Sequence, residues 1–116
     1  MAGNPRRVVA YTKADAAVKA VLAAGKSWPS QEKGLYLFVR DNALKLPGLV
    51  LAGVISESRR EESVRLLTDE LAVASALEYA LGAAVSTSTN EAVKKASDAA
   101  VEAREAVQDH LDAMQI

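Results

Sequence analysis

The chemistry open to this chain is limited by residue types that are absent or occur only once. Its 116 residues include no cysteine and a single histidine, His110. Disulfides, thiolate nucleophiles and thiolate metal sites are therefore excluded. Zinc sites use several His and Cys ligands, and no stretch has the alternating Asp and Asn of a calcium loop. We expect no metal and no cofactor, and we interpret His110 as a solvated or half-buried residue late in a helix.

Carboxylates and serines offer the remaining routes to catalysis. Glu78 is the only charged residue between Leu71 and Val85, and a carboxylate on an apolar helix can act as a general acid or base. The structural alternative, in which Glu78 reaches water or an arginine, is favoured because no second catalytic group accompanies it. The chain contains no Gly-x-Ser-x-Gly elbow and no phosphate-binding loop. The sequence therefore predicts no catalytic residue and no enzyme.

Two arginine pairs are the candidates for contacts to nucleic acid. Arg6 and Arg7 lie within residues 1–11, which are expected to form a loosely ordered N-terminal arm. Arg59 and Arg60 lie among three glutamates, which cancel their local field. The formal net charge of −1 gives no overall attraction to phosphates. Nucleic acid is therefore a less favoured partner than protein.

Apolar spacing and alanine content predict an all-α chain. Half of the residues are hydrophobic, and alanine, the best helix former, is common among them. We expect a first helix over 12–25, capped by Thr12, and a second over 30–46, capped by Ser30. A β-hairpin through residues 35–39 is the less favoured alternative, because aromatic and β-branched residues also suit strands.

The segment from Leu49 to Ile55 contains only apolar residues and glycine. It is too short for a membrane span, which needs about 20 apolar residues. Because Pro47 can occupy the first turn of a helix, we interpret this segment as a short core helix, separate from the preceding one. A buried strand remains an alternative, and an exposed segment would instead be a surface for a partner.

The strongest helical pattern begins after Arg60. Its apolar face consists of Val64, Leu67, Leu71, Ala74, Leu77, Leu81 and Val85. Beyond Leu71 the other faces are apolar too, so we expect this helix to be buried on nearly every side and to form the centre of the fold. On this interpretation Gly82 marks a close approach of two helices.

The last helix, from Asn90 to Met114, is expected to be capped by Thr89 or Asn90. It is alanine-rich and carries a narrow apolar seam. The seam includes Val93, Ala96, Ala100, Val107 and Leu111. About 25 residues at 1.5 Å each reach nearly 40 Å, which exceeds the first two expected helices. The excess length predicts that the seam pairs with a second copy, as a homodimer, or with another protein. Trp28 is interpreted first as a cap on one end of the core and second as a partner anchor.

Together these patterns predict one domain over residues 1–116, a compact bundle of four to five helices with a long, Ala-rich C-terminal helix. The leading functional hypothesis is a small cytoplasmic, bacterial or phage protein that regulates or assembles others through protein–protein association. One alternative is a DNA-binding transcriptional regulator that uses the N-terminal arm or the helix after Arg60. Another is an enzyme or ligand carrier with a pocket near Glu78 and Tyr79.

Overall fold

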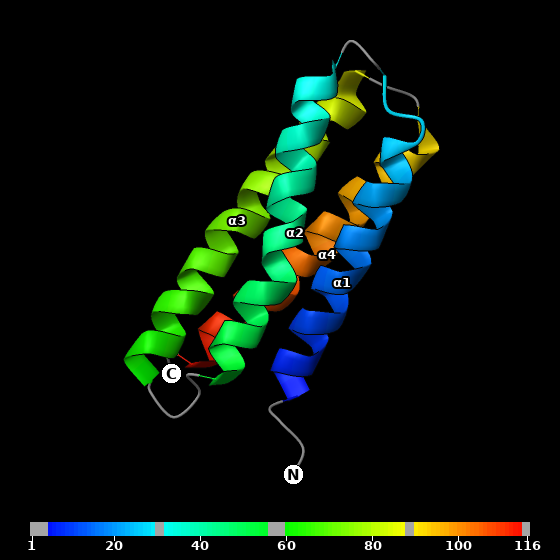
Figure 1. Ribbon diagram of the computed structural model, residues 1–116. Coiled ribbons are helices and arrows are strands. Elements are labelled where there is room, and N and C mark those ends of the chain that lie inside the picture. Colours follow the sequence, from blue (N-terminus) through cyan, green and yellow to red (C-terminus); the bar gives the residue numbers. More distant parts are fainter. Residues whose placement is uncertain (1–4, 30–31, 56–59, 88–89, 115–116) are drawn as a thin grey trace.

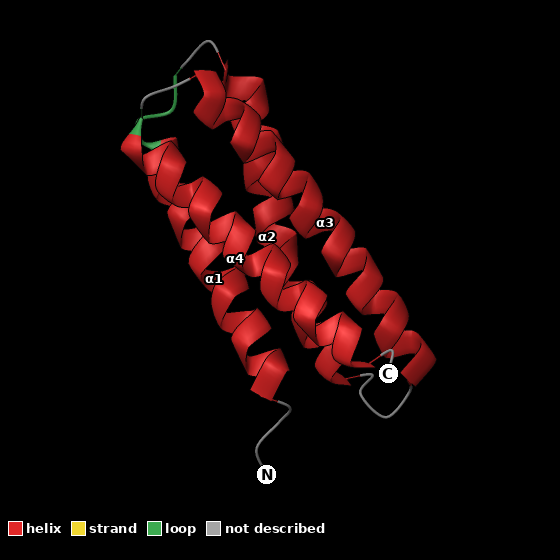
Figure 2. Ribbon diagram, turned by 180° about the vertical axis from the view of Figure 1, so that it is seen from behind, coloured by secondary structure: helices red, strands yellow, loops and turns green. Residues whose placement is uncertain are grey.

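The fold is an up-down-up-down bundle of four helices. The computed structural model describes residues 5–29, 32–55, 60–87 and 90–114. Its helices are α1 (Pro5–Gly25), α2 (Lys33–Ile55), α3 (Arg60–Thr87) and α4 (Glu91–Met114). Each helix packs against the next, and α1 also packs against α4, while the backbones of the diagonal pairs lie farther apart within the described residues. The bundle measures 45 × 23 × 20 Å (Figures 1 and 2).

Every helix turns the same heptad pattern toward the bundle axis. Apart from Ala80 and Leu111, the buried positions are separated alternately by three and four residues, the spacing at which antiparallel helices pack at a small crossing angle. They are Ala10, Ala14, Ala17, Val21 and Ala24 in α1, Val39, Ala43 and Leu46 in α2, Ser63, Leu67, Glu70, Ala74, Leu77, Leu81 and Ala84 in α3, and Val93, Ala96, Ala100, Ala103, Val107 and His110 in α4. All the elements of the described residues are helices, which confirms the all-α prediction. Burial of one face stabilises each of them.

Alanine dominates the interior. Of the twenty buried hydrophobic residues in the described part of the chain, eleven are alanine. Such small side chains let neighbouring helices approach closely, but each one buries little apolar area. The core therefore depends on many small contacts and on a few larger side chains, such as Leu46, Leu77 and Leu81.

Helix α1 begins at Pro5, well before the predicted start at Thr12. The arm expected over residues 1–11 is therefore wrong from Pro5 onward. Proline suits the first turn of a helix, where its missing N–H would have no partner. Ala10 is buried against side chains of α3 and α4, so packing holds the early turns. The Thr12 hydroxyl donates a hydrogen bond to the Val8 carbonyl at 2.9 Å, inside the helix.

Helix α2 continues through Pro47, so the separate short helix predicted after it is wrong. A proline inside a helix costs about 3 kcal/mol, because a hydrogen bond is lost and the ring crowds the preceding turn. Val39, Ala43 and Leu46 are fully buried just before it, and this packing offsets the cost. The chain consequently forms four helices rather than five within the described residues.

Residues 35–39 are helical, so the helical prediction for this stretch is confirmed and the hairpin alternative is wrong. The predicted cap, Ser30, lies outside the described residues, and so do the side chains of Leu49 to Ile55. Whether those side chains form core or interface therefore stays a prediction.

The four helices are similar in length, which removes the reason for a protruding last helix. They contain 21, 23, 28 and 24 residues in chain order. Helix α4 is therefore covered along its length by α1 and α3. Helix α3 was predicted to be the centre of the fold, but it is one of four equivalent corners of the bundle, with its backbone close only to those of α2 and α4 among the described residues.

The start of α4 is capped by Asn90, one of the two predicted caps, and the other, Thr89, lies outside the described residues. The Asn90 side-chain oxygen accepts hydrogen bonds from the backbone N–H groups of Ala92 at 2.8 Å and Val93 at 3.4 Å. Its side-chain nitrogen donates to the carbonyl of Ser27 at 3.0 Å. One residue thus satisfies the first turn of α4 and ties it to the segment that follows α1.

Candidate functional site

Glu78 lies in an ion pair rather than alone. The Nε atom of Arg104 donates a hydrogen bond to Glu78 Oε2 at 2.7 Å, and both side chains are about 30% exposed. This hydrogen bond, together with the attraction between the charges, raises the pKa of Arg104. The structural interpretation of Glu78, in which it reaches an arginine, is confirmed.

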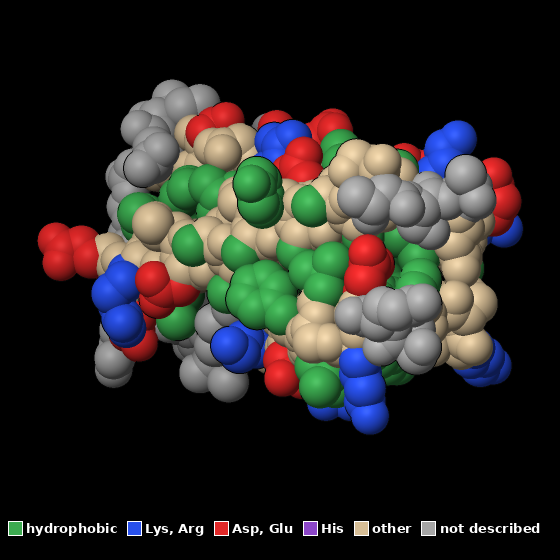
Figure 3. All heavy atoms as spheres, turned by 90° about the horizontal axis from the view of Figure 1, so that it is seen from above, with side chains coloured by type: hydrophobic (Ala, Val, Ile, Leu, Met, Phe, Trp, Pro, Cys, Tyr) green, Lys and Arg blue, Asp and Glu red, His purple; other side chains and the backbone are tan. Residues whose placement is uncertain are grey.

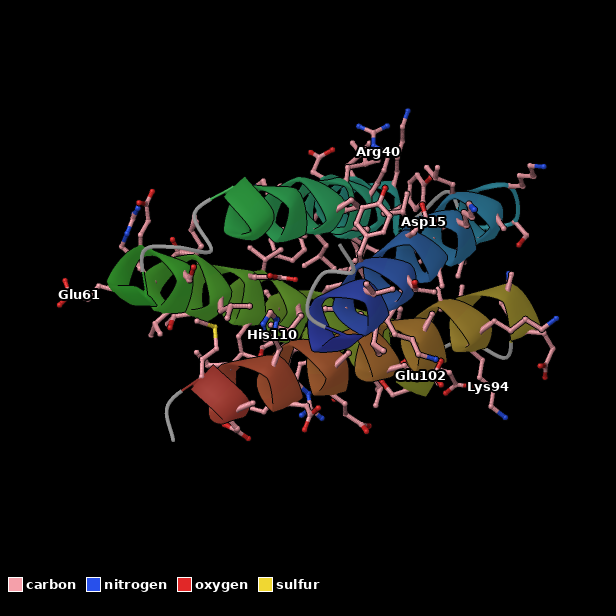
Figure 4. The ribbon with its side chains drawn as sticks, turned by 90° about the horizontal axis from the view of Figure 1, so that it is seen from below. Asp15, Arg40, Glu61, Lys94, Glu102 and His110 are labelled. Atoms are coloured by element: carbon pink, nitrogen blue, oxygen red, sulfur yellow. The ribbon has the colours of Figure 1, made fainter. Side chains whose placement is uncertain are left out.

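His110 is buried, with only 2% of its surface exposed, so the expectation of a solvated or half-buried residue is wrong. Figure 4 shows it inside the bundle, where α3 and α4 meet. Glu70 and Ser63 on α3 are each 1% exposed. We call these three residues the polar core. They are buried because the heptad pattern places all of them on inner faces.

Sequence reasoning missed Ser63 and Glu70 of the polar core and placed His110 incorrectly. Glu70 follows Leu67 by three residues and precedes Ala74 by four, so the heptad pattern alone could have found it. Within the described residues, no group of three or more His, Asp and Glu side chains is arranged to hold a metal ion. The polar core is buried inside the bundle, so changes to it are expected to act on the stability of the fold.

The outer side of α3 and α4 is hollowed by a groove of about 530 Å³. It is lined by Ser75, Glu78, Tyr79, Gly82, Ala83, Ser97 and Val101. We call it the α3–α4 groove. Most of its lining side chains are small, whereas the Tyr79 side chain beside them is 82% exposed.

This groove contradicts the prediction that α3 is buried on nearly every side. Gly82 does not mark a close approach of two helices, because a Cβ atom built there would meet no atom within 4 Å. The outer side chains of α3 are apolar but small, so exposing them to water costs little free energy. Their small size leaves a hollow beside the Tyr79 ring. The sequence showed the apolar residues but not which neighbour would cover them.

The outer side of α1 and α2 carries a different kind of apolar surface. Two contacts define the flanks of α1: Gly25 lies against the Tyr36 ring of α2, and Lys13 pairs with Glu102 of α4 at 3.5 Å. Positions related to Gly25 by helical spacing therefore point toward α2. These positions hold Val8, Tyr11, Val18 and Leu22.

Helix α2 extends the same surface. Figure 4 shows Asp15 of α1 and Arg40 of α2 on one side of the bundle. Leu37 lies three residues before Arg40 and Leu44 four residues after it, so both share its face of the helix. Val8, Tyr11, Leu22 and Leu44 are between 39% and 58% exposed. We call this surface, with Val18 and Leu37, the α1–α2 face.

The two sides of the bundle carry opposite charge. Helices α1 and α2 hold seven basic and two acidic side chains, a formal charge of +5. Helices α3 and α4 hold five basic and eleven acidic side chains, a formal charge of −6. The net charge of −1 conceals this separation, because the remaining charged residues cancel.

Trp28 packs against the main hydrophobic cluster, and its ring lies 5.3 Å from that of Tyr36. Its indole N–H donates a hydrogen bond to the carbonyl of Glu32 at 3.1 Å. These contacts agree with the interpretation of Trp28 as a cap on the core. With Gly25, Pro29 and Lys33, the two rings border a second hollow of about 240 Å³.

The expected partner seam of α4 lies inside the bundle. Its members, Val93, Ala96, Ala100, Val107 and Leu111, are at most 5% exposed. They pack against α1 and α3, which also have heptad faces, so the seam serves the fold of this chain. A partner would have to bind elsewhere on the folded molecule.

The two arginine pairs cannot be placed at a nucleic-acid surface. The side chains of Arg6, Arg7 and Arg60 and the whole of Arg59 lie outside the described residues. Figure 3 shows one side of the molecule, where hydrophobic side chains lie open among basic and acidic ones. A DNA-binding role stays a prediction.

Comparison with known proteins identified no relative of this chain. No protein-family model matches the chain, and no significant match occurs among the curated proteins or the solved structures. Among the described residues, no helix has the length and apolar character needed to cross a membrane.

Proposed function

We propose that this protein is a non-catalytic interaction module that binds a helical surface of a protein partner in the α3–α4 groove. The observation that carries the proposal is the exposure of Tyr79, at 82%, beside a groove lined by small residues. Tyrosine is enriched among the few residues that contribute most of the binding energy at protein interfaces. A groove of this kind suits an amphipathic helix laid along it.

The length of the uncharged surface supports a helix as the bound element. From Leu71 to Thr87, helix α3 contains 17 residues, of which only Glu78 is charged. At 1.5 Å per residue this stretch extends about 25 Å, or nearly five helical turns. Since Glu78 is already neutralised by Arg104, an apolar stripe on a partner helix meets no isolated charge there.

The charge of this side defines the chemistry of the partner. The α3–α4 half carries a formal charge of −6, so basic side chains that flank the apolar stripe of the partner would be attracted to it. Such complementarity speeds association and rejects acidic competitors. The expected partner element is therefore a helix with large apolar side chains on one face and lysine or arginine beside them.

Photo-crosslinking in the organism that encodes the protein tests this proposal. Benzoylphenylalanine at position 79 is expected to capture a helical segment with basic flanks. The matched control carries the same group at the exposed position 102, on the other flank of α4. Equal capture from both positions, or no capture from position 79, would contradict the proposal.

A second variant separates binding from folding. A Cβ atom at Gly82 would meet no atom within 4 Å, so Gly82→Leu places a bulky side chain in the groove without a clash at its base. The circular dichroism and the unfolding midpoint are expected to persist while crosslinking from position 79 is lost. Undiminished crosslinking in this variant would show that the groove does not hold the partner.

A further inference from the structure

We propose that the helical surface bound by the α3–α4 groove is the α1–α2 face of a second copy of this chain. The inference rests on the proposed function and identifies its partner. Successive copies would then associate head to tail, with each molecule both offering a face and receiving one.

The two sides of the molecule carry opposite charge, which is the first reason to expect that they bind each other in neighbouring copies. A second copy that presents its α1–α2 half brings a formal charge of +5 toward a half with −6. Two identical halves facing each other would instead bring charges of the same sign together. Electrostatics therefore favours the pairing of unlike sides over a symmetric pairing of like sides.

The apolar surfaces match in kind. The α1–α2 face presents large side chains, among them Tyr11, Leu22 and Leu44, whereas the α3–α4 groove presents small residues around a hollow. Large side chains that enter a hollow lose contact with water on both partners. The stripe on α1 runs from Val8 to Leu22, about 22 Å at 1.5 Å per residue, close to the length of the uncharged stretch on α3.

Charged groups on the α1–α2 face do not prevent this docking. Lys19 pairs with Asp15 at 2.9 Å, and Arg40 pairs with Asp41 at 3.2 Å. The acidic residues nearest the stripe are thus neutralised within the same helix, and the basic excess of this half remains.

The dimensions of the bundle are sufficient for a stable contact. One side measures 45 × 20 Å, and stable interfaces cover about 800 Å² on each partner. Because the two docking surfaces differ, the contact is heterologous and generates a ring or an open chain of copies rather than a closed dimer.

Sedimentation velocity of the full chain at increasing concentration and salt tests the inference. At low salt the sedimenting mass is expected to rise with concentration above the monomer mass of 12.3 kDa. High salt is expected to return it toward the monomer, because screening weakens attraction between exposed charges. A monomer at every concentration in low salt would overturn the inference.

Two charge-reversal variants identify the surfaces. The first, Lys19→Glu with Arg40→Glu, changes the α1–α2 face; the second, Asp98→Lys with Glu105→Lys, changes the rim of the groove on either side of Val101. Each variant alone is expected to stay monomeric, and an equimolar mixture is expected to associate again, since unlike charges then meet. Circular dichroism confirms that both remain folded.

Other outcomes are also decisive. Association that is lost in the first variant but unchanged in the second would indicate a symmetric contact between α1–α2 faces, and would contradict head-to-tail docking. If position 79 crosslinks to a different protein while this chain stays monomeric, the proposed function stands and the inference fails. If the chain associates but Gly82→Leu associates equally well, the groove is not the contact between copies and the inference fails, while crosslinking from position 79 still decides the proposed function.

Discussion

The α1–α2 half and the α3–α4 half of the bundle share an inner pattern but differ on their outer surfaces. Both turn heptad positions inward, with alanine prevailing in α1 and larger or polar side chains more frequent in α3. Outside, one half is basic with large exposed hydrophobic side chains, and the other is acidic with a groove. The shared inner pattern explains the fold, whereas the difference outside is where binding specificity can arise.

This comparison also shows why net charge is a poor guide to partners here. A value of −1 suggested a protein without electrostatic preference. The bundle places the two basic helices next to each other and the two acidic helices next to each other. The field of each side is therefore far stronger than the total implies.

The largest expected change in the free energy of unfolding comes from a substitution on the inner face of α3, and the matched substitution on its outer face should have almost no effect. Leu77 is completely buried, and Tyr79, two residues later, is 82% exposed. We expect Leu77→Ala to lower the free energy of unfolding by about 3 kcal/mol, since it removes buried methyl groups and leaves a cavity. Tyr79→Ala should change it by less than about 0.5 kcal/mol. Urea unfolding measures both, and a comparable loss in the two variants would contradict this division.

The polar core gives the next largest effect, and among the residues whose burial is described it is confined to the α3–α4 half. Glu70→Leu and His110→Leu, made singly, are each expected to lower the free energy of unfolding by about 1–3 kcal/mol, because a change to one buried polar group disturbs the hydrogen bonding of others. The double variant should be as stable as the original protein, or more so, since an apolar core needs no such bonds. Strictly additive losses in a double-mutant cycle would show that the two residues act separately.

Two glycines, one in each half, should respond in opposite directions. A Cβ atom at Gly25 would collide with the Tyr36 ring, whereas one at Gly82 meets nothing within 4 Å. Gly25→Ala is expected to destabilise the protein by about 1–2 kcal/mol through overpacking. Gly82→Ala should stabilise it by up to about 1 kcal/mol, because alanine favours helix. Thermal unfolding of the pair tests this, and a stabilised Gly25→Ala would mean that Tyr36 moves aside freely.

The smallest effect concerns the ion pairs that flank the two sides of α4. The Glu78–Arg104 pair is 2.7 Å long and about 30% exposed, whereas the Lys13–Glu102 pair is 3.5 Å long and more exposed. Double-mutant cycles should give a coupling of about 0.5 kcal/mol for the first pair and a lower value for the second, given solvent screening. A stronger coupling in the Lys13–Glu102 pair would reverse the ranking.

Local signals in the sequence predicted several features correctly. Asn90 caps α4 because its side chain accepts from the first N–H groups of the helix, which is a property of a few consecutive residues. The helical character of residues 35–39 also followed from spacing, despite their aromatic and β-branched side chains. The structural interpretation of Glu78 was correct as well, although the sequence could not name Arg104 as its partner.

Features that depend on neighbouring helices were predicted incorrectly. Pro47 was expected to end a helix, but buried residues before it keep α2 continuous. His110 was expected to be solvated or half-buried, because the sequence of a largely charged helix does not show which of its residues lie on the inner face. The α4 seam was assigned to a partner for the same reason: an apolar stripe shows that something covers it, but not what.

By itself the sequence determined that this chain is helical, where several helices end, and that thiolate chemistry is impossible, since these follow from local propensity and composition. Only the tertiary structure decided which apolar faces are covered, that Glu70 and His110 enter the core, and that basic and acidic helices separate to opposite sides. The physical reason is that burial and electrostatic fields depend on which helices become neighbours. That choice is made by packing between segments far apart in the chain.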